Sequence, residues 1–155
     1  MSNTTDAAAI SAPSGNTSLY ITNSHVTGNH GAAYGAIAVE GTVSVSDSHF
    51  ADNMSSGTSS MGAAINAQAP SPVGEAKVAI SGSEFSGNQA ELAGGAIYVS
   101  GMPTKIVSAS SLHDNEVVGT GGTGGAVAGS NSAVQVLDST FTSNTADTEI
   151  GRAHV

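Results

Sequence analysis

The chain has 155 residues, of which 39% are hydrophobic, 10% charged and 4% aromatic, and its formal net charge is -9. Three Lys and Arg residues are too few to neutralise the phosphates of nucleic acid or an anionic membrane surface, so neither is an expected partner. The absence of Cys excludes disulfide scaffolds and thiolate metal sites. No apolar run reaches the roughly 20 residues of a membrane-spanning helix, so we expect no membrane-spanning segment in this chain.

The N-terminal residues 1–17 are rich in Asn, Thr, Ala and Ser, and they carry neither the basic start nor the apolar stretch of a signal peptide. We expect residues 1–17 to form a flexible polar segment. A repeated pattern occupies the next part of the chain, over residues 18–147.

Five copies of the string Ser-x-apolar-x-x-Asn carry this pattern, and both the Ser and the Asn are present in every copy. The large apolar residues are Val26, Phe50, Phe85, Leu112 and Phe141, and the asparagines are Asn29, Asn53, Asn88, Asn115 and Asn144. Upstream of each copy, mostly β-branched residues alternate with other side chains, which predicts a β-strand with one buried face.

A third block of two small residues, Ala and a β-branched residue follows each complete copy. The four blocks are Tyr34-Gly35-Ala36-Ile37, Gly62-Ala63-Ala64-Ile65, Gly94-Gly95-Ala96-Ile97 and Gly124-Gly125-Ala126-Val127. This block is typical of a strand entered through a tight bend. Three strands per coil, stacked over about four to five coils, predict an all-β fold: a right-handed, single-stranded parallel β-helix.

Stacked coils bring equivalent positions next to one another. We expect the five large apolar residues to form an inward core column with a spacing of about 4.8 Å. We expect the five asparagines to form a structural ladder at one corner, because each amide can bond to its equivalent in the next coil and to the turn backbone.

The two alternating motifs, Phe-x-x-Asn and Gly-Gly-Ala-Ile, resemble the repeats of the chlamydial polymorphic outer membrane proteins. The Phe-x-x-Asn matches run from Phe50 to Asn53, Phe85 to Asn88 and Phe141 to Asn144, and Gly94 to Ile97 matches the second motif. The resemblance implies a pectin lyase-like β-helix in a surface-exposed or secreted protein, outer membrane-associated if bacterial, with adhesion as its role. Host or environmental surface molecules, protein or glycan, would be its partners.

The C-terminal residues 148–155 break the repeat and contain the single Arg of the chain, Arg152. We expect them to be a non-native or disordered tail. The fifth copy stops before its expected Gly-Gly-Ala block, which favours a fragment of a longer solenoid whose further partners are coils of the same parent protein.

A possible metal site is the row of positions that precede the large apolar residue, because strand alternation turns them outward. They include His25, His49 and Glu84, and two imidazoles beside a carboxylate can bind Zn²⁺ or Cu²⁺. The alternative is an exposed polar row. We predict no metal and no cofactor; His25, His49 and Glu84 are the residues that would hold a metal ion if one were bound. His30 and His113 are expected to be solvated.

Acidic residues recur at two further positions of the repeat, as Asp47 and Asp138 at one and as Asp52 and Asp114 at the other. Carboxylates on coil corners can hold Ca²⁺, whereas the alternative is that Asp favours the turn itself. At neither of these two positions do adjacent coils both carry an acidic residue, which favours turn formation.

The expected function is non-catalytic adhesion or recognition through loops on a rigid solenoid. The loops 68–77 and 115–124 are the expected contact sites. The alternative is a carbohydrate-active β-helix that binds or cleaves polysaccharide, as a pectate lyase-like enzyme or a glycoside hydrolase. Such an enzyme needs a base beside paired carboxylates, and Lys77 and Lys105 occupy different positions of the repeat. We therefore predict no catalytic residues.

Overall fold

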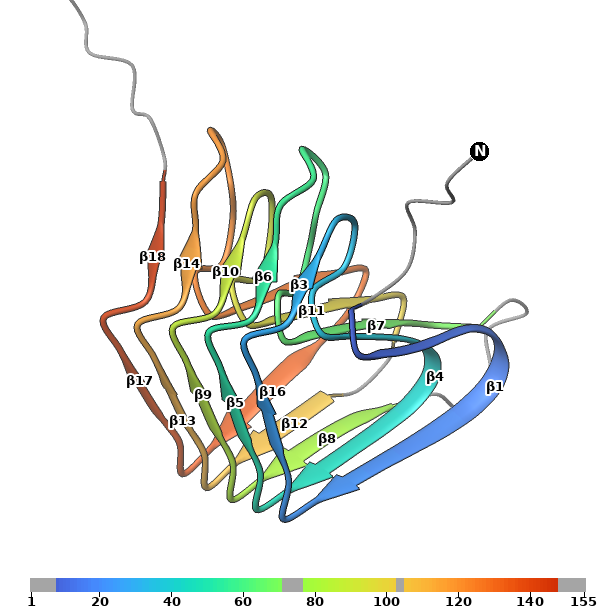
Figure 1. The fold of residues 1–155 in the computed structure, drawn as a ribbon. Helices are drawn as coiled ribbons and strands as arrows, with labels where there is room; N and C mark the ends of the chain where they lie inside the picture. The colour runs from blue at the N-terminus through green and yellow to red at the C-terminus, as the bar shows by residue number, and fades with distance from the viewer. Residues whose placement is uncertain (1–7, 71–76, 103–104, 148–155) are drawn as a thin grey trace, which may run out of the picture.

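A computed structural model of the chain describes residues 8–70, 77–102 and 105–147. The fold is all-β, and the described residues form a parallel β-helix of about four turns without any helix. Figure 1 shows the coils lying side by side, with equivalent strands adjacent. Since this part of the chain holds no helix, it also holds none long and apolar enough to cross a membrane.

The largest sheet has eight strands and contains two strands from each later coil. Its order is β15-β11-β7-β4-β8-β12-β16, with β1 paired to β4. The strands are β1 (Ile10–Thr22), β4 (Ile37–Ser46), β7 (Ile65–Gln68), β8 (Val78–Ser81), β11 (Ile97–Ser100), β12 (Lys105–Ser108), β15 (Val127–Ser130) and β16 (Val134–Leu137). Every pairing in this sheet is parallel and joins equivalent positions of neighbouring coils.

Strand β4 is long because it joins two strands that are separate in the later coils. Its first residues pair with β7 and its last residues with β8. Gly41 lies between these two parts with φ of 144°, and a Cβ there would collide with the backbone oxygen of Thr17 on β1. Only glycine fits a bend at which two backbones approach so closely.

The first strand starts earlier than the sequence predicts. β1 begins at Ile10, and Ile10, Ser11 and Ala12 pair with the start of β4. Residues 10–17 therefore belong to the first coil, within the range that we expected to be a flexible polar segment. The tail 148–155, the rest of the N-terminus (1–7) and most of the loop 68–77 lie outside the described residues.

Two five-stranded sheets complete the coil. The first has the order β17-β13-β9-β5-β2 and comprises β2 (His25–Thr27), β5 (His49–Ala51), β9 (Glu84–Ser86), β13 (Ser111–His113) and β17 (Thr140–Thr142). The second comprises the two-residue strands β3 (His30–Gly31), β6 (Met54–Ser55), β10 (Gln89–Ala90), β14 (Glu116–Val117) and β18 (Thr145–Ala146). These short strands follow each repeat asparagine and add a fourth strand to the three that the sequence predicts for each coil.

Each coil contributes one residue to the expected core column, and this column packs beside buried Ile, Val and Ala residues. Phe50 and Phe85 are fully buried, and their rings stack with centroids 4.7 Å apart and planes 3° from parallel. Leu112 is also fully buried, whereas Val26 is half-buried and Phe141 is 39% exposed. The pairing of the strands places all five expected core residues in one column.

The corners explain the acidic positions of the repeat. Every residue at the position before the repeat Ser has a positive φ, namely Asn23, Asp47, Gly82, Ala109 and Asp138. The same holds before the repeat Asn, at Gly28, Asp52, Gly87, Asp114 and Ser143. Gly, Asn and Asp are the residues that tolerate this left-handed conformation best. The structure therefore accounts for Asp at these positions by turn formation, without a bound Ca²⁺.

The repeat asparagines lie along one edge and hydrogen-bond from coil to coil. From Asn53 onward, each Oδ1 accepts from the backbone N–H and from Nδ2 of the preceding asparagine, with side-chain distances of 2.9 Å throughout. The Nδ2 of Asn53, Asn88, Asn115 and Asn144 also donates to the carbonyl of the large apolar residue in the preceding coil. Because Asn has both a donor and an acceptor, it can continue this ladder in both directions.

The repeat serines form a second ladder at the preceding corner. Ser48 Oγ, for example, accepts from the backbone N–H of Ser24 at 3.1 Å and donates to the carbonyl of Ser46 at 2.7 Å. The same two bonds recur at Ser83, Ser110 and Ser139. The two ladders flank strands β2, β5, β9, β13 and β17, so they fix the register of the outward side chains on that sheet.

Candidate functional site

Three outward side chains form a hydrogen-bonded cluster on the sheet that comprises β2, β5, β9, β13 and β17. His49 Nδ1 lies 3.0 Å from Glu84 Oε2, and His113 Nε2 lies 2.9 Å from Glu84 Oε1. His25 continues the line, since its ring centroid is 5.7 Å from that of His49. We call His25, His49, Glu84 and His113 the histidine row.

The register of the strands produces this row. His25 pairs with His49 and His49 pairs with Glu84 across the parallel strands β2, β5 and β9. Glu84 pairs with Ser111, and His113 lies two residues further along β13 on the same outward face. Such diagonal neighbours are within reach of long side chains.

His113 lies between two carboxylates. Its Nε2 contacts Glu84 and its Nδ1 lies 2.8 Å from Asp114 Oδ2. Since an ionised carboxylate can only accept, both ring nitrogens must donate, and a ring that donates from both nitrogens is the imidazolium form. The hydrogen bond to Asp114, followed by that to Glu84, raises the pKa of His113 above its ordinary value of 6.5.

Glu84 receives hydrogen bonds from the imidazoles on either side. The bond from His113 is the largest cause that lowers the pKa of Glu84 below its ordinary value of 4.5, and the bond from His49 adds to it. Glu84 is therefore an anion at neutral pH, so His49 Nδ1 is the donor in its contact with Glu84. The remaining nitrogen of His49, Nε2, is then free to accept when the ring is neutral.

A shallow, open groove runs beside the histidine row and crosses several coils. The residues that line it include His25, Asp47, His49, Glu84, Asp138 and Thr140. With Ser111 from the fourth coil, the lining residues come from five successive coils, which at a spacing of about 4.8 Å extend over about 19 Å. A groove of this length suits an extended chain, and its carboxylates make it acidic.

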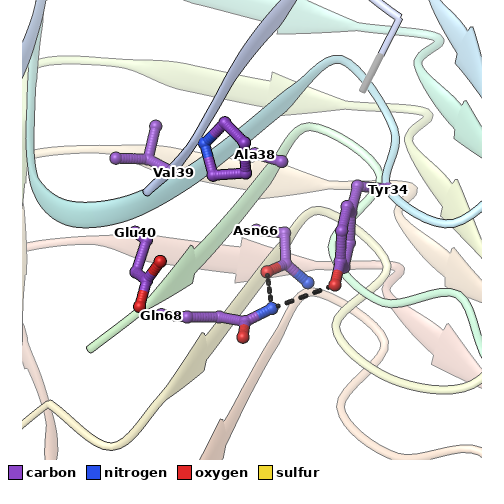
Figure 2. Close-up of a pocket in the computed structure, with 7 residues that line it drawn as sticks. Tyr34, Ala38, Val39, Glu40, Asn66 and Gln68 are labelled. Carbon is purple, nitrogen blue, oxygen red and sulfur yellow. Dashed lines mark hydrogen bonds between the residues drawn. The ribbon is translucent and has the colours of Figure 1, made fainter. Parts of the chain in front are cut away.

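A second hollow lies over strands β4 and β7 and has about 360 Å³ of empty space, part of it open solvent (Figure 2). Gln68 Nε2 donates to the hydroxyl oxygen of Tyr34 at 3.3 Å and to Asn66 Oδ1 at 3.0 Å. Asn66 is almost fully buried and donates to the carbonyl of Met61. These bonds hold an aromatic ring and two amides in place, and Glu40 pairs with Gln68 on the neighbouring strand.

The sequence-predicted metal candidates are only partly brought together. His25, His49 and Glu84 follow one another along the row, but Glu84 contacts His113 as well as His49. Within the described ranges, no group of three or more His, Asp or Glu side chains is arranged to hold a metal ion by itself.

His113 was expected to be solvated, but it bonds to Glu84 and Asp114, and the Tyr34 hollow was not anticipated from the sequence. Strand alternation was the missed signal for His113, because it puts Ser111 and His113 on the same face of β13. For the hollow, the signal was Tyr34 itself, which stands where the later blocks have Gly62, Gly94 and Gly124. Those three glycines have a positive φ, and Tyr34 does not. His30, expected to be solvated, is exposed and contacts Ser56 Oγ at 2.9 Å.

Comparisons of the chain with protein-family models, with curated proteins and with solved structures each found no match.

Proposed function

We propose that this chain is a non-catalytic recognition segment of a surface-exposed or secreted protein, with adhesion as its role. The observation that supports this most directly is the long groove beside the histidine row, built from unlike side chains on a sheet whose register is fixed by the two ladders. A rigid solenoid with varied outward side chains presents many weak contacts at fixed spacing, which together give avidity.

The connections between coils add to this proposal. Loops of different length leave the two-residue strands on one edge of the solenoid (Figure 1), among them residues 56–64 and 118–126. Loops that vary on a constant scaffold are where recognition usually resides. The resemblance to the polymorphic outer membrane protein repeats points the same way, since adhesion is the role that it implies.

The second candidate is a carbohydrate-active β-helix of the pectate lyase-like kind. The acidic groove favours it, because an extended polysaccharide would fit along it and Asp47, Glu84 and Asp138 could meet the sugar hydroxyls. Paired carboxylates for glycoside hydrolysis stand about 5–10 Å apart. Asp47 and Asp138, which are three coils apart, are separated by about 14 Å along the stack.

The two candidates are tested together by incubating the purified protein with a panel of glycans and extracellular proteins. Recognition predicts that a ligand is retained without change of chain length, and that Glu84→Arg in the groove weakens retention more than Glu116→Arg on β14. Depolymerisation of a glycan that is lost in Asp47→Asn or Glu84→Gln would overturn the non-catalytic proposal. Failure of every surface molecule to bind would overturn both.

A further inference from the structure

We infer that His25 and His49 form a binding site for a divalent transition-metal ion, Cu²⁺ or Zn²⁺, with Glu84 as the positioning residue of His49. The metal ion is a ligand that the recognition function does not require. It rests on the distance between the two rings, on the hydrogen bond that fixes one of them, and on their place in an open groove.

The distance between the rings allows them to share an ion. Imidazole binds Zn²⁺ with a bond of about 2.0–2.1 Å, so two rings on one ion have centroids no more than about 6.2 Å apart. The His25 and His49 centroids are 5.7 Å apart, and the ring planes are tilted by 53°. A tetrahedral ion would draw the centroids to about 5 Å, a shift that two surface side chains can make by rotation.

The orientation of His49 favours metal binding. Metal-binding histidines usually donate their second ring nitrogen to a carboxylate, which sets the tautomer and makes the bound nitrogen more basic. His49 Nδ1 donates to Glu84 Oε2 at 3.0 Å, so Nε2 carries the lone pair of the neutral ring. Glu84 is itself held in place by His113 on its other side. Glu84 was a candidate metal ligand from the sequence. In the structure it is better placed to orient the ligand His49.

The surroundings leave room for the ion. The side chain of His49 is 32% exposed, His25 is exposed, and both residues line the groove. With two protein ligands, the other coordination positions fall to water or to donor atoms of a molecule in the groove. Affinity should follow the general order for divalent ions, with Cu²⁺ bound more tightly than Zn²⁺.

The chain offers matched controls for both parts of the site. His30 is an exposed imidazole outside the pair and contacts Ser56, so His30→Gln controls for His25→Gln and His49→Gln. Glu116, which contacts Gln89, provides Glu116→Ala as the control for Glu84→Ala. Circular dichroism checks that each variant keeps the fold.

The test is calorimetric titration of the full chain with Zn²⁺ and with Cu²⁺, together with nitrogen NMR of the Zn²⁺-loaded protein. We expect His25→Gln and His49→Gln each to weaken binding at least about tenfold, and Glu84→Ala by about 10–100-fold, with both controls unchanged. The His49 resonance that moves on loading should be Nε2. Equal losses in His30→Gln, unchanged affinity in both histidine variants, or coordination through His49 Nδ1 would each overturn the inference.

Discussion

Asn88 Nδ2 donates to Asn115 Oδ1 at 2.9 Å, while Asn88 Oδ1 accepts from Asn53 on its other side. The residue is fully buried, and its Nδ2 also donates to the carbonyl of Phe50 at 3.0 Å. This one amide therefore joins three coils, and the same arrangement along the ladder holds the neighbouring strands in register.

Replacing Asn88 with Asp should destabilise the protein strongly. The carboxylate would keep the acceptor but lose both donated bonds, and its charge would face two carbonyl oxygens in a buried place. A buried charge without a partner costs about 3–5 kcal/mol. Urea unfolding measures the loss. Asn29→Asp in the first coil is the control: Asn29 is only half-buried, so we expect a clearly smaller change. Equal losses at the two positions would contradict the ladder account.

The stacked phenylalanines should contribute most to the core. Phe85→Ala removes a fully buried ring that stacks on Phe50, and such truncations cost about 3–5 kcal/mol. Phe141→Ala makes the same chemical change in a ring that is 39% exposed, so it should cost less than half as much. The two free energies of unfolding are measured side by side, and a larger loss at Phe141 would contradict the burial pattern.

One corner offers a stabilising substitution. Ala109 has φ of 46° where other coils have Gly, Asn or Asp. An L-residue in the left-handed conformation costs about 1–2 kcal/mol, and glycine removes this strain. Glycine also loses more backbone entropy on folding than alanine does, so the net stabilisation by Ala109→Gly should be about 0.5–1 kcal/mol. Ala79→Gly within strand β8 should instead destabilise by about 0.5–1 kcal/mol. Opposite signs in thermal unfolding would support the account, and a loss in both variants would refute it.

The histidine row should make stability depend on pH in two directions. The raised pKa of His113 gives a contribution that is complete below about 6.5 and is lost as the pH rises through the folded-state pKa. The lowered pKa of Glu84 gives a contribution that is complete above about 4.5 and is lost as the pH falls through its own folded-state pKa. Both contributions are complete between these two values.

This pH dependence is measured by comparing the wild type with His113→Gln. The difference in free energy of unfolding should be larger at pH 5.5 than at pH 9, and proton NMR should show His113 titrating above 6.5. The groups that face His113 are Glu84 and Asp114, and both remain in the variant. A difference that grows toward pH 9 would contradict the assigned contacts.

Most of the fold follows from repetition in the sequence. Alternation over the strands, the recurring Ser and Asn, and the Gly-Ala block each have a local physical cause, so an all-β stack of coils could be predicted without long-range information. The two-residue strands could not, because a pair such as Met54–Ser55 is too short to show alternation. The early start of β1 was hidden in the same way, since Ile10 is a single β-branched apolar residue among Ala, Ser and Pro.

The candidate site was only partly predictable. The sequence places His25, His49 and Glu84 in one outward column, because column membership depends on the repeat alone. The repeat does not determine which neighbouring side chains form hydrogen bonds with one another. Glu84 bonds to His113 in the next coil as well as to His49, because long side chains can also reach the more distant diagonal neighbour. The hollow beside Tyr34 depends on side-chain packing across β4 and β7, which the repeat does not encode.

The central claim is that the asparagine ladder locks the coils in register and so fixes the outward face. Side-chain amide hydrogen exchange by NMR tests it most directly. The account predicts that the Nδ2 protons of Asn53, Asn88 and Asn115 exchange slowly, as protected as the strand amides beside them, while those of exposed Asn23 exchange fast. Exchange of the ladder amides at the rate of Asn23 would contradict the claim.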